Sequence, residues 1–380
     1  MSIYLDHAAA TPLDERVFAA MEPYLRDHFH NPSAAYGPAR DVRSALDEAR
    51  RTLASCLGAK PDELILTAGA TESINLAFTV CRPDDHVVIG ATEHASVRGA
   101  AAGYHVVVAA SDSKGRITPE AVATAITDQT RLVSVTAADS ELGTLQPLRK
   151  IADGIATARK DRHNRGILAP LYFHSDASQA AGAIDLSLTR LGVDLLTLSA
   201  AKCYGPKQVG LLWARAGVPL RPLVRGGGQE RGLRSGTENV AGVIGFAEAL
   251  RLAQKKRVGE SERLLALRNE LARRLAVATP DLIVNGDPRR HLPGHLNVSV
   301  PGVDAERVVY RLDMQGVYVA TGAACAANKG LRSSVLTATG MSETAADGSI
   351  RLSLGRSTTE DDAVQAARLI TEAFKSERYL

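Results

Sequence analysis

The sequence predicts an α/β protein in which a large domain with a mostly parallel sheet is joined to a smaller α+β domain. From about residue 38 to residue 255, short apolar runs that are typical of strands alternate with helical patterns. Strand–helix alternation of this kind favours a parallel sheet that is covered by helices on both faces. The chain has 380 residues, more than a single hydrophobic core usually serves, so we expect a second domain.

The expected strands of the large domain are short runs rich in Val, Ile and Leu, which suit buried strands. They lie at residues 63–67, 86–90, 104–108, 131–135, 171–174 and 194–199. Helical patterns alternate with them, for example at residues 42–57 and 118–126. Open α/β sheets bind ligands beyond the carboxyl ends of their strands, so polar side chains directly after these runs are the first candidates for a functional site.

The charged stretch at residues 254–260 marks the expected change of domain. We predict that the large domain spans residues 16–257 and that the small domain combines residues 1–15 with residues 258–380. The small domain is expected to contain two strands and a closing helix, at residues 294–300, 316–320 and 360–374.

The composition is that of an ordinary globular protein, with 45% hydrophobic and 23% charged residues. A net charge of +3 and 4% aromatic residues give little reason to expect direct contact with nucleic acid. No apolar run reaches the roughly 18 residues that would suggest a membrane span. The first residues show neither a basic nor an apolar leader region, so we expect no signal peptide and a cytoplasmic location.

The four cysteines are spaced too widely for a zinc site or a disulfide framework, and no metal is expected. Cys325 stands among Ala and Gly residues, a context that favours an accessible and reactive thiol. Cys203 is the rival thiol, but we expect it to pack in a turn. Cys56 and Cys81 occur in helical or apolar surroundings and are expected to be inert.

Lys202 and Asp176 follow successive expected strands and carry the main functional signal. Pyridoxal phosphate needs such a pair, because a lysine forms a Schiff base with its aldehyde and an aspartate pairs with its pyridinium nitrogen. The pair alone is weak evidence, since most lysines and aspartates at strand ends are solvated or cap a helix. Its weight depends on the surrounding motifs.

A phosphate site is expected where the strand at residues 63–67 passes through a small-residue turn into a helix. The free backbone N–H groups of Ala70 and Thr71 and the helix dipole favour an anion there. Thr71 and Ser199 add hydroxyl groups. The alternative is a capped helix without a ligand.

His94 and Gln179 also follow expected strands. An imidazole at position 94 would stack on a pyridine ring and exchange protons, although a lone histidine after a strand is more often structural. If a helical turn begins at Asp176, Gln179 points into the same cleft and would donate to a ring hydroxyl.

Two further segments carry arginine. Residues 225–239 combine glycines and arginines with a capping box, Ser235-x-x-Glu238, and suit an active-site rim or a subunit interface as well as a helix start. Arg356 ends an apolar strand, and its guanidinium could grip an α-carboxylate bidentately.

Taken together, these motifs resemble one known family. The chain is similar to a cysteine desulfurase of the NifS/IscS type, among the class V aminotransferase-like enzymes of pyridoxal-phosphate fold type I. The matching segments occur in the family's order at residues 4–12, 31–33, 69–73, 93–94, 141–144, 176–179, 202, 226–239, 325 and 355–356.

The resemblance implies a homodimer that converts L-cysteine to L-alanine and delivers sulfur to an acceptor protein, for example in iron–sulfur cluster assembly. It implies Lys202, Cys325 and His94 as catalytic residues, with Cys325 carrying a persulfide. Cofactor contacts are implied for Ala70, Thr71, His94, Asp176, Gln179, Ser199, Lys202 and, across the dimer, Thr237. Substrate contacts are implied for Arg356, Ser140 and Asn31.

The chain departs from the family pattern at several of these places. Ala201 stands where a phosphate-binding histidine is usual, and Ser140 and His7 replace asparagines. Cys325 lacks its usual Ser and Thr neighbours. Two other hypotheses therefore stay open: a selenocysteine lyase or class V aminotransferase, and a non-catalytic homologue that relays sulfur.

Overall fold

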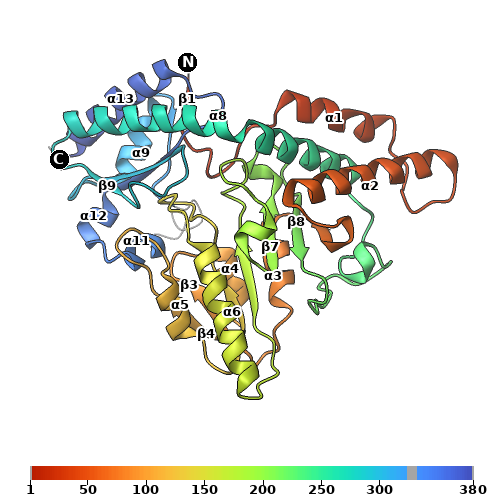
Figure 1. Ribbon diagram of the computed structural model, residues 1–380. Helices are drawn as coiled ribbons and strands as arrows, with labels where there is room; N and C mark the ends of the chain where they lie inside the picture. The colour runs from red at the N-terminus through yellow and green to blue at the C-terminus, as the bar shows by residue number, and fades with distance from the viewer. Residues whose placement is uncertain (1, 323–331, 379–380) are drawn as a thin grey trace.

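The structure is a computed structural model that describes residues 2–322 and 332–378 (Figure 1). Its largest sheet has seven strands in the order β2-β8-β7-β6-β5-β3-β4. Only β8 runs antiparallel to its neighbours in this sheet. The strands are β2 (Leu64–Thr67), β3 (His86–Gly90), β4 (His105–Ala109), β5 (Thr130–Ser134), β6 (Tyr172–Asp176), β7 (Leu195–Ser199) and β8 (Gly210–Ala214). The mostly parallel sheet confirms the predicted fold class.

Helices cover both faces of this sheet because its strands are apolar on both sides. Leu64 and Leu66 of β2 pack into one core cluster, and Ile65 between them packs into the other. Leu195 and Leu196 of β7 divide in the same way. The helices around the sheet are α1 (Glu15–Arg26), α2 (Gly37–Leu57), α3 (Ala70–Phe78), α4 (Ala95–Ala101), α5 (Pro119–Ala125), α6 (Leu148–Asn164) and α7 (Leu188–Leu191).

A second core lies beside the first. It is built on an antiparallel sheet in the order β12-β10-β9 and on the parallel pair β1-β11. The strands are β1 (Ile3–Tyr4), β9 (Ile283–Asn285), β10 (His295–Ser299), β11 (Val317–Tyr318) and β12 (Ser349–Ser353). The helices of this part of the chain, after β10, are α9 (Ala305–Met314), α11 (Ser334–Ala338), α12 (Glu343–Asp347) and α13 (Glu360–Arg378).

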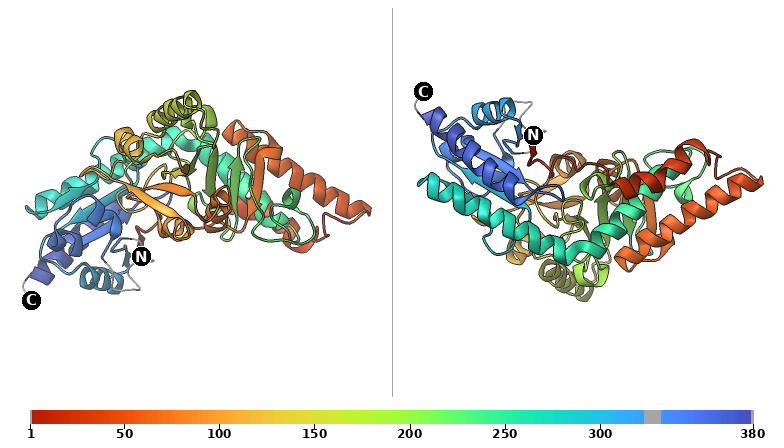
Figure 2. Two further views of the ribbon diagram at one scale, coloured as in Figure 1. Left: turned by 90° about the horizontal axis from the view of Figure 1, so that it is seen from below. Right: turned by 90° about the horizontal axis from the view of Figure 1, so that it is seen from above.

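One long helix, α8 (Val240–Ala278), belongs to both cores. Its first half places Phe246 and Leu250 in the core of the large sheet, and its second half places Leu271 and Leu275 in the second core. Figure 2 shows α8 running along the molecule from the region of α1 and α2 to that of α13. The change of core therefore takes place along a continuous helix and not at a loop.

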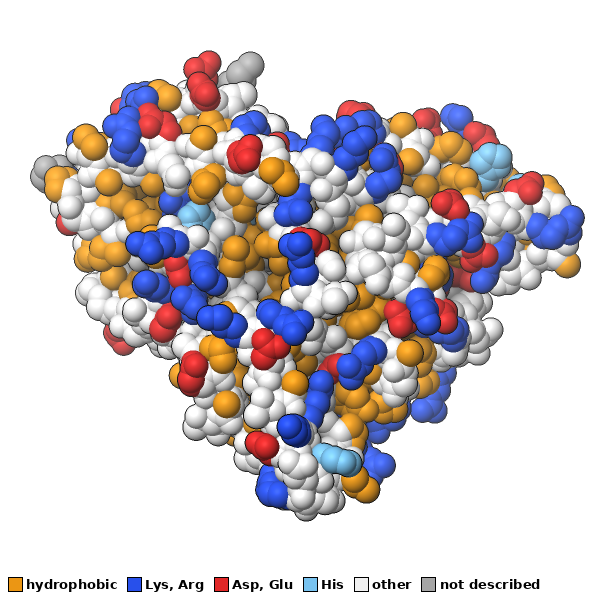
Figure 3. Space-filling view, in the orientation of Figure 1, with side chains coloured by type: hydrophobic (Ala, Val, Ile, Leu, Met, Phe, Trp, Pro, Cys, Tyr) orange, Lys and Arg blue, Asp and Glu red, His pale blue; other side chains and the backbone are white. Residues whose placement is uncertain are grey.

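The face seen in Figure 3 carries Lys and Arg side chains among acidic and apolar ones. Within residues 2–322 and 332–378, no helix combines the length and apolar character that crossing a membrane requires.

The start of β12 offers a test of the packing in the second core. A Cβ added at Gly348 would lie 2.0 Å from the carbonyl oxygen of Val300. Because a backbone atom cannot yield easily, we expect Gly348→Ala to lower the free energy of unfolding by about 1–3 kcal/mol or more. Gly154→Ala in α6, where nothing lies within 4 Å of an added Cβ, is the matched control.

Gly154→Ala should raise the free energy of unfolding by roughly 0.5–1 kcal/mol, because alanine favours a helix interior more than glycine does. Thermal unfolding followed by circular dichroism measures both variants. An unchanged melting temperature for Gly348→Ala would show that β12 does not pack against Val300 as described.

Candidate active site

A cavity of about 510 Å³ lies at the carboxyl ends of the parallel strands. The segments after β2, β3, β5, β6 and β7 all contribute to its wall, and β12 and residues 8–10 close it from the second core. Of the residues predicted from the sequence, the lining includes Ala70, Thr71, His94, Ser140, Asp176, Gln179, Ser199 and Lys202. The fold therefore brings together eight predicted site residues that are far apart in the sequence.

Lys202 ends the short helix η2 (Ala200–Lys202) directly after β7. Its Nζ donates to the carbonyl oxygens of Ala8 and Ala9, at 2.8 and 2.6 Å. The turn that follows is unusual, because Tyr204 and Gln208 adopt left-handed backbone conformations, with φ of 65° and 59°. Such conformations cost energy in residues other than glycine and collect at functional sites.

The N-terminal segment is hydrogen-bonded to the turn that contains Lys202, residues 201–204. Thr11 Oγ1 donates to the carbonyl oxygen of Ala201 and accepts from the backbone N–H of Tyr204, at 3.0 and 2.8 Å. Gln179 Nε2 donates to the carbonyl oxygen of Ala8 at 2.9 Å. Lys202 and Gln179 are thus held by the same short stretch of backbone.

Asp176 and His94 stand on neighbouring loops of the cavity. Asp176 is the last residue of β6, and its Oδ1 accepts from the backbone N–H of Ser178 at 2.9 Å. His94 caps α4, and its Nδ1 accepts from the backbone N–H of Ser96 at 3.1 Å. Burial lowers the pKa of His94, with Asp176 opposing the shift and Lys202 adding to it. The neutral imidazole therefore carries its proton on Nε2.

The expected phosphate end of the cavity is the start of α3. Gly69 precedes the helix with φ of 129°, a conformation that favours glycine. A Cβ on Gly210 would lie 2.6 Å from Gly69, so two glycines are needed for β8 to pass this turn. Thr71 is exposed toward the cavity, and Lys207, which the sequence analysis did not identify, lines the same cavity.

Two carboxyl groups at or next to the cavity wall, those of Glu93 and Asp139, are buried. Burial raises the pKa of Glu93 to about 8 and that of Asp139 to about 7. Asp139 lines the cavity, and its carboxyl oxygens accept from the backbone N–H groups of Glu141, Leu142 and Thr144. Asp139 therefore holds the turn that carries Ser140.

Arg351 is a cavity residue that the sequence analysis missed. It lies in the middle of β12, is 2% exposed and lines the cavity. Its Nη2 pairs with Asp6 Oδ1 at 2.6 Å, and its Nη1 donates to the carbonyl oxygen of Ser140 at 3.1 Å. Its buried Nε has no hydrogen-bond partner among the described residues. An arginine between Ile350 and Leu352 of an expected strand was the available signal.

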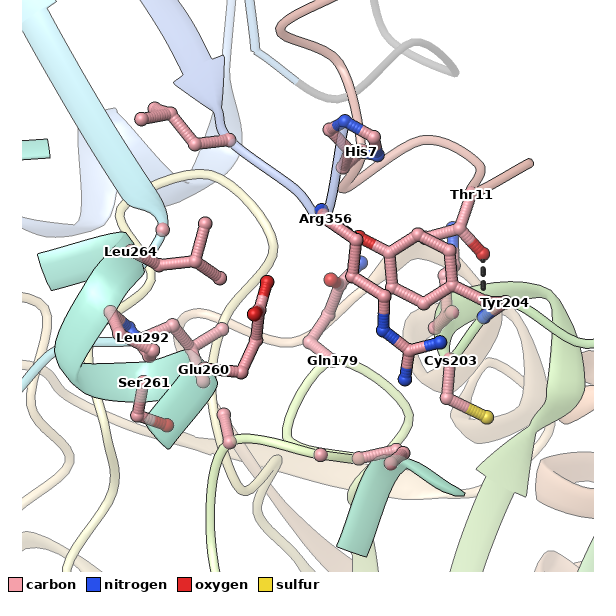
Figure 4. A pocket seen from close by; sticks show the side chains of 18 of the residues that line it. His7, Thr11, Gln179, Cys203, Tyr204, Glu260, Ser261, Leu264, Leu292 and Arg356 are labelled. Atoms are coloured by element: carbon pink, nitrogen blue, oxygen red, sulfur yellow. Dashed lines mark hydrogen bonds between the residues drawn. The ribbon is translucent and has the colours of Figure 1, made fainter. Parts of the chain in front are cut away.

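Arg356, predicted to bind the substrate carboxylate, does not line the large cavity. It lines a neighbouring cavity of about 90 Å³ together with His7, Glu260 and Lys202 (Figure 4). Its Nη1 pairs with Asp14 Oδ2 at 2.9 Å, and its guanidinium stacks 4.0 Å from the centre of the Tyr204 ring. Arg356 therefore already has partners in Asp14 and Tyr204.

Two other predicted residues, Thr237 and Asn31, do not line the large cavity of this single chain. Thr237 lines a separate cavity of about 190 Å³, which shares Ala68 and Gln208 with the large one. Asn31 is exposed, and its Oδ1 accepts from the backbone N–H of Ser33. Cys325 lies outside the described residues.

The described cysteines are poor nucleophiles. Burial raises the pKa of Cys56 to about 11, and those of Cys81 and Cys203 to about 12. Cys203 is 1% exposed and its Sγ bonds to the carbonyl oxygen of Ala200, so it packs in the turn as expected. Because a thiolate is the reactive form, none of these three is suited to attack a substrate.

The chain is similar to known proteins over nearly its whole length. The Aminotransferase class-V family model matches residues 3–366. The chain is 38% identical over 370 residues to the cysteine desulfurase IscS of Dictyoglomus turgidum, covering 95% of this chain and 91% of that protein. These matches confirm the family resemblance that the sequence predicts.

Two solved structures are similar as well. A NifS-like protein is 32% identical, with a TM-score of 0.89 and coverage of 99% of this chain and 100% of that one. SspA in complex with cysteine is 30% identical, with a TM-score of 0.79 and coverage of 93% and 99%. The likeness confirms the predicted fold type.

The buried carboxyl group of Glu93 generates a pH prediction. Its pKa rises from 4.5 to about 8 on folding, so between these values the unfolded state binds fewer protons and stability falls as pH rises. Glu93→Gln does not titrate and keeps an oxygen for the N–H of Thr136, which donates to Glu93 Oε1 at 2.7 Å. Relative to the wild type, this variant should gain roughly 2–4 kcal/mol between pH 5 and pH 8.

Denaturant unfolding of both proteins at the two pH values measures this gain. Parallel pH profiles for the wild type and the variant would mean that Glu93 ionises normally in the fold.

Proposed function

The chain belongs to the class V aminotransferase family and, within it, to the cysteine desulfurases, and we propose that it uses pyridoxal phosphate to convert L-cysteine to L-alanine. The sulfur is retained as a persulfide on Cys325 and passes to an acceptor protein. The observation that carries this proposal is the meeting of Lys202, Asp176 and His94 on the wall of one cavity.

The lining of the cavity fits the cofactor. Lys202 offers the amine for its aldehyde, Asp176 a carboxylate for its pyridinium nitrogen, and the start of α3 a set of backbone N–H groups for its phosphate. Ala70, Thr71 and Ser199 would hold the phosphate, His94 would cover the ring, and Gln179 would donate to the ring hydroxyl. When bound, pyridoxal phosphate supplies a ring that accepts electron density from the substrate's Cα.

Ala201 contributes no hydrogen bond to the phosphate. The loss of one such contact costs about 1–3 kcal/mol of cofactor binding. Lys207 lines the same cavity and carries a positive charge, which would offset part of this loss.

The protein's own groups would handle the protons and the sulfur. Lys202 Nζ takes the α-proton of the bound cysteine, and the neutral imidazole of His94 exchanges protons on the same side. The Cys325 thiolate attacks the substrate sulfur, forming an S–S bond as the Cβ–S bond breaks. The electron pair of that bond stays with Cβ, which takes one proton, and Lys202 returns a proton to Cα, so that alanine forms.

For the substrate carboxylate we propose Arg351, a role that the sequence analysis gave to Arg356. Arg351 lines the cavity that contains Lys202 and Ser140, and its Nε has no partner among the described residues. Arg356 is engaged by Asp14 and Tyr204 next to the smaller cavity. A guanidinium buried in the wall binds a carboxylate more strongly than an exposed one, because water competes less.

A homodimer is part of the proposal. Thr237 and Asn31 stay outside the large cavity of one chain, yet the cavity next to Thr237 shares two lining residues with it. A second copy of the chain would bring such residues to the phosphate and the substrate.

The central test uses Cys325→Ala and Lys202→Ala beside the wild type. After treatment with cysteine, the intact wild-type chain should gain the mass of one sulfur atom at Cys325. Cys325→Ala should keep the yellow colour of the bound cofactor but acquire no persulfide. After borohydride reduction, the wild type should carry the cofactor covalently and Lys202→Ala should not. Mass spectrometry and absorbance spectra report all of these outcomes.

Undiminished sulfide release by Cys325→Ala would reject its role. A keto-acid product without persulfide would favour transamination instead.

The two arginines can be separated by ligand binding. Replacing Arg351 with lysine keeps the charge but loses the bidentate geometry, so alanine and cysteine should bind roughly 10–100-fold more weakly. Arg356→Gln should change their affinity far less. Titration of the holoenzyme, followed by cofactor absorbance, measures both variants.

Cysteamine, which lacks the carboxylate, serves as the control ligand, and its affinity should be insensitive to Arg351→Lys. Weaker alanine binding in Arg356→Gln alone would return the role to Arg356.

A further inference from the structure

One side chain is bonded to one end of the segment that contains Cys325 and lies beside the other end. Glu141 is 3% exposed, and Ser333 Oγ donates a hydrogen bond of 2.5 Å to its Oε2. On the other side, a Cβ added to Gly322 would lie 3.2 Å from the same oxygen. Gly322 directly precedes residues 323–331, and Ser333 follows them after one further residue.

The two ends also lie beside each other. The Cβ position on Gly322 is 3.9 Å from Ser333 Cβ, and Gly322 has φ of 134°, which favours glycine. Gly322 and Ser333, which flank the segment with Cys325, therefore lie side by side. The carboxyl group of Glu141 lies next to both of these residues.

The same turn forms part of the cavity wall. Ser140, the residue before Glu141, lines the cavity and accepts from Arg351 through its carbonyl oxygen. The backbone N–H of Glu141 donates to Asp139 at 3.0 Å, and its carbonyl oxygen accepts from Asn297 Nδ2 at 3.4 Å. The backbone of the turn is thus fixed without the Glu141 side chain, so shortening this side chain should leave the wall in place.

We propose that Glu141 is a positioning residue for sulfur transfer. Its carboxyl group holds Ser333, at one end of the segment carrying Cys325, beside Gly322 at the other end, so that this segment starts and ends at the wall of the active site. This inference rests on the proposed function. Glu141 acts through Gly322 and Ser333, and it is given no contact with substrate or cofactor.

The physical reason is the effective concentration of a tethered thiol. It is set by the length and geometry of the tether and falls when the tether's ends are released. Displacement of a reacting group by about 1 Å can cost roughly 10²-fold in rate. Losing the bond between Ser333 and Glu141 releases one end of this tether.

The test compares Glu141→Ala with Glu141→Gln in the holoenzyme. The alanine variant leaves Ser333 without its acceptor, whereas the glutamine variant keeps an amide oxygen in reach. We expect the alanine variant to form the persulfide on Cys325 about 10–100-fold more slowly in a single turnover. Cysteine binding, followed by cofactor absorbance, should keep its wild-type midpoint, and the glutamine variant should recover most of the rate.

A second readout needs neither cofactor nor activity. Ser333 Oγ also caps α11, because it accepts from the backbone N–H of Leu336 at 3.1 Å. Amide hydrogen exchange in α11 of the cofactor-free protein should therefore quicken in the alanine variant but not in the glutamine variant. Ser342→Ala, which removes the cap of α12, is the matched control: it should quicken exchange in α12 and leave persulfide formation unchanged.

The proposal is overturned if Glu141→Ala forms persulfide at the wild-type rate, if cysteine binding weakens in the same proportion as the rate, or if the glutamine variant is as slow as the alanine variant. A wild type that forms no persulfide would reject the proposed function instead. In that case the exchange experiment still decides whether Glu141 anchors α11.

Discussion

The active site depends on the contact between the Lys202 amine and the N-terminal backbone. Lys202 Nζ donates to the carbonyl oxygens of Ala8 and Ala9, which follow the strand β1 of the second core. Part-buried carbonyl groups need such donors, so this contact joins the second core to the carboxyl end of the large sheet. Under the proposed function the same amine must leave these carbonyls to meet the cofactor. Gln179 would then still donate to Ala8.

Burial determines which groups at the site carry charge. The environment lowers the pKa of His94 and raises those of Glu93 and Asp139. A lowered pKa favours the neutral imidazole of His94, and a raised pKa favours the protonated carboxyl group of Glu93. Lys202, Arg351 and Asp176 are the other ionisable groups of interest in the wall. Charged groups whose side chains are buried, such as Arg351, act more strongly on a bound ligand than exposed ones. This suits a reaction in which negative charge develops on the substrate.

The two arginines show how the fold assigns roles to similar residues. Arg351 and Arg356 are five positions apart, at the middle and just beyond the end of β12. Arg351 is paired with Asp6 and faces the large cavity, whereas Arg356 is paired with Asp14 beside the smaller one. Glu141 follows Ser140 of the same wall, accepts a hydrogen bond from Ser333 and lies beside Gly322. Substrate binding and sulfur transfer would therefore share one scaffold.

The sequence alone determined the parallel sheet and most of its site, because parallel strands align their carboxyl ends and local patterns mark those ends. Lys202, Asp176 and His94 were identifiable for this reason. The tertiary structure decided that Arg351 lines the large cavity, that Arg356 does not, and that Glu141 meets Gly322 and Ser333. These contacts depend on how the second core packs against the first. The local pattern of apolar residues predicts helices and strands. It does not predict how two cores built from distant parts of the sequence pack against each other.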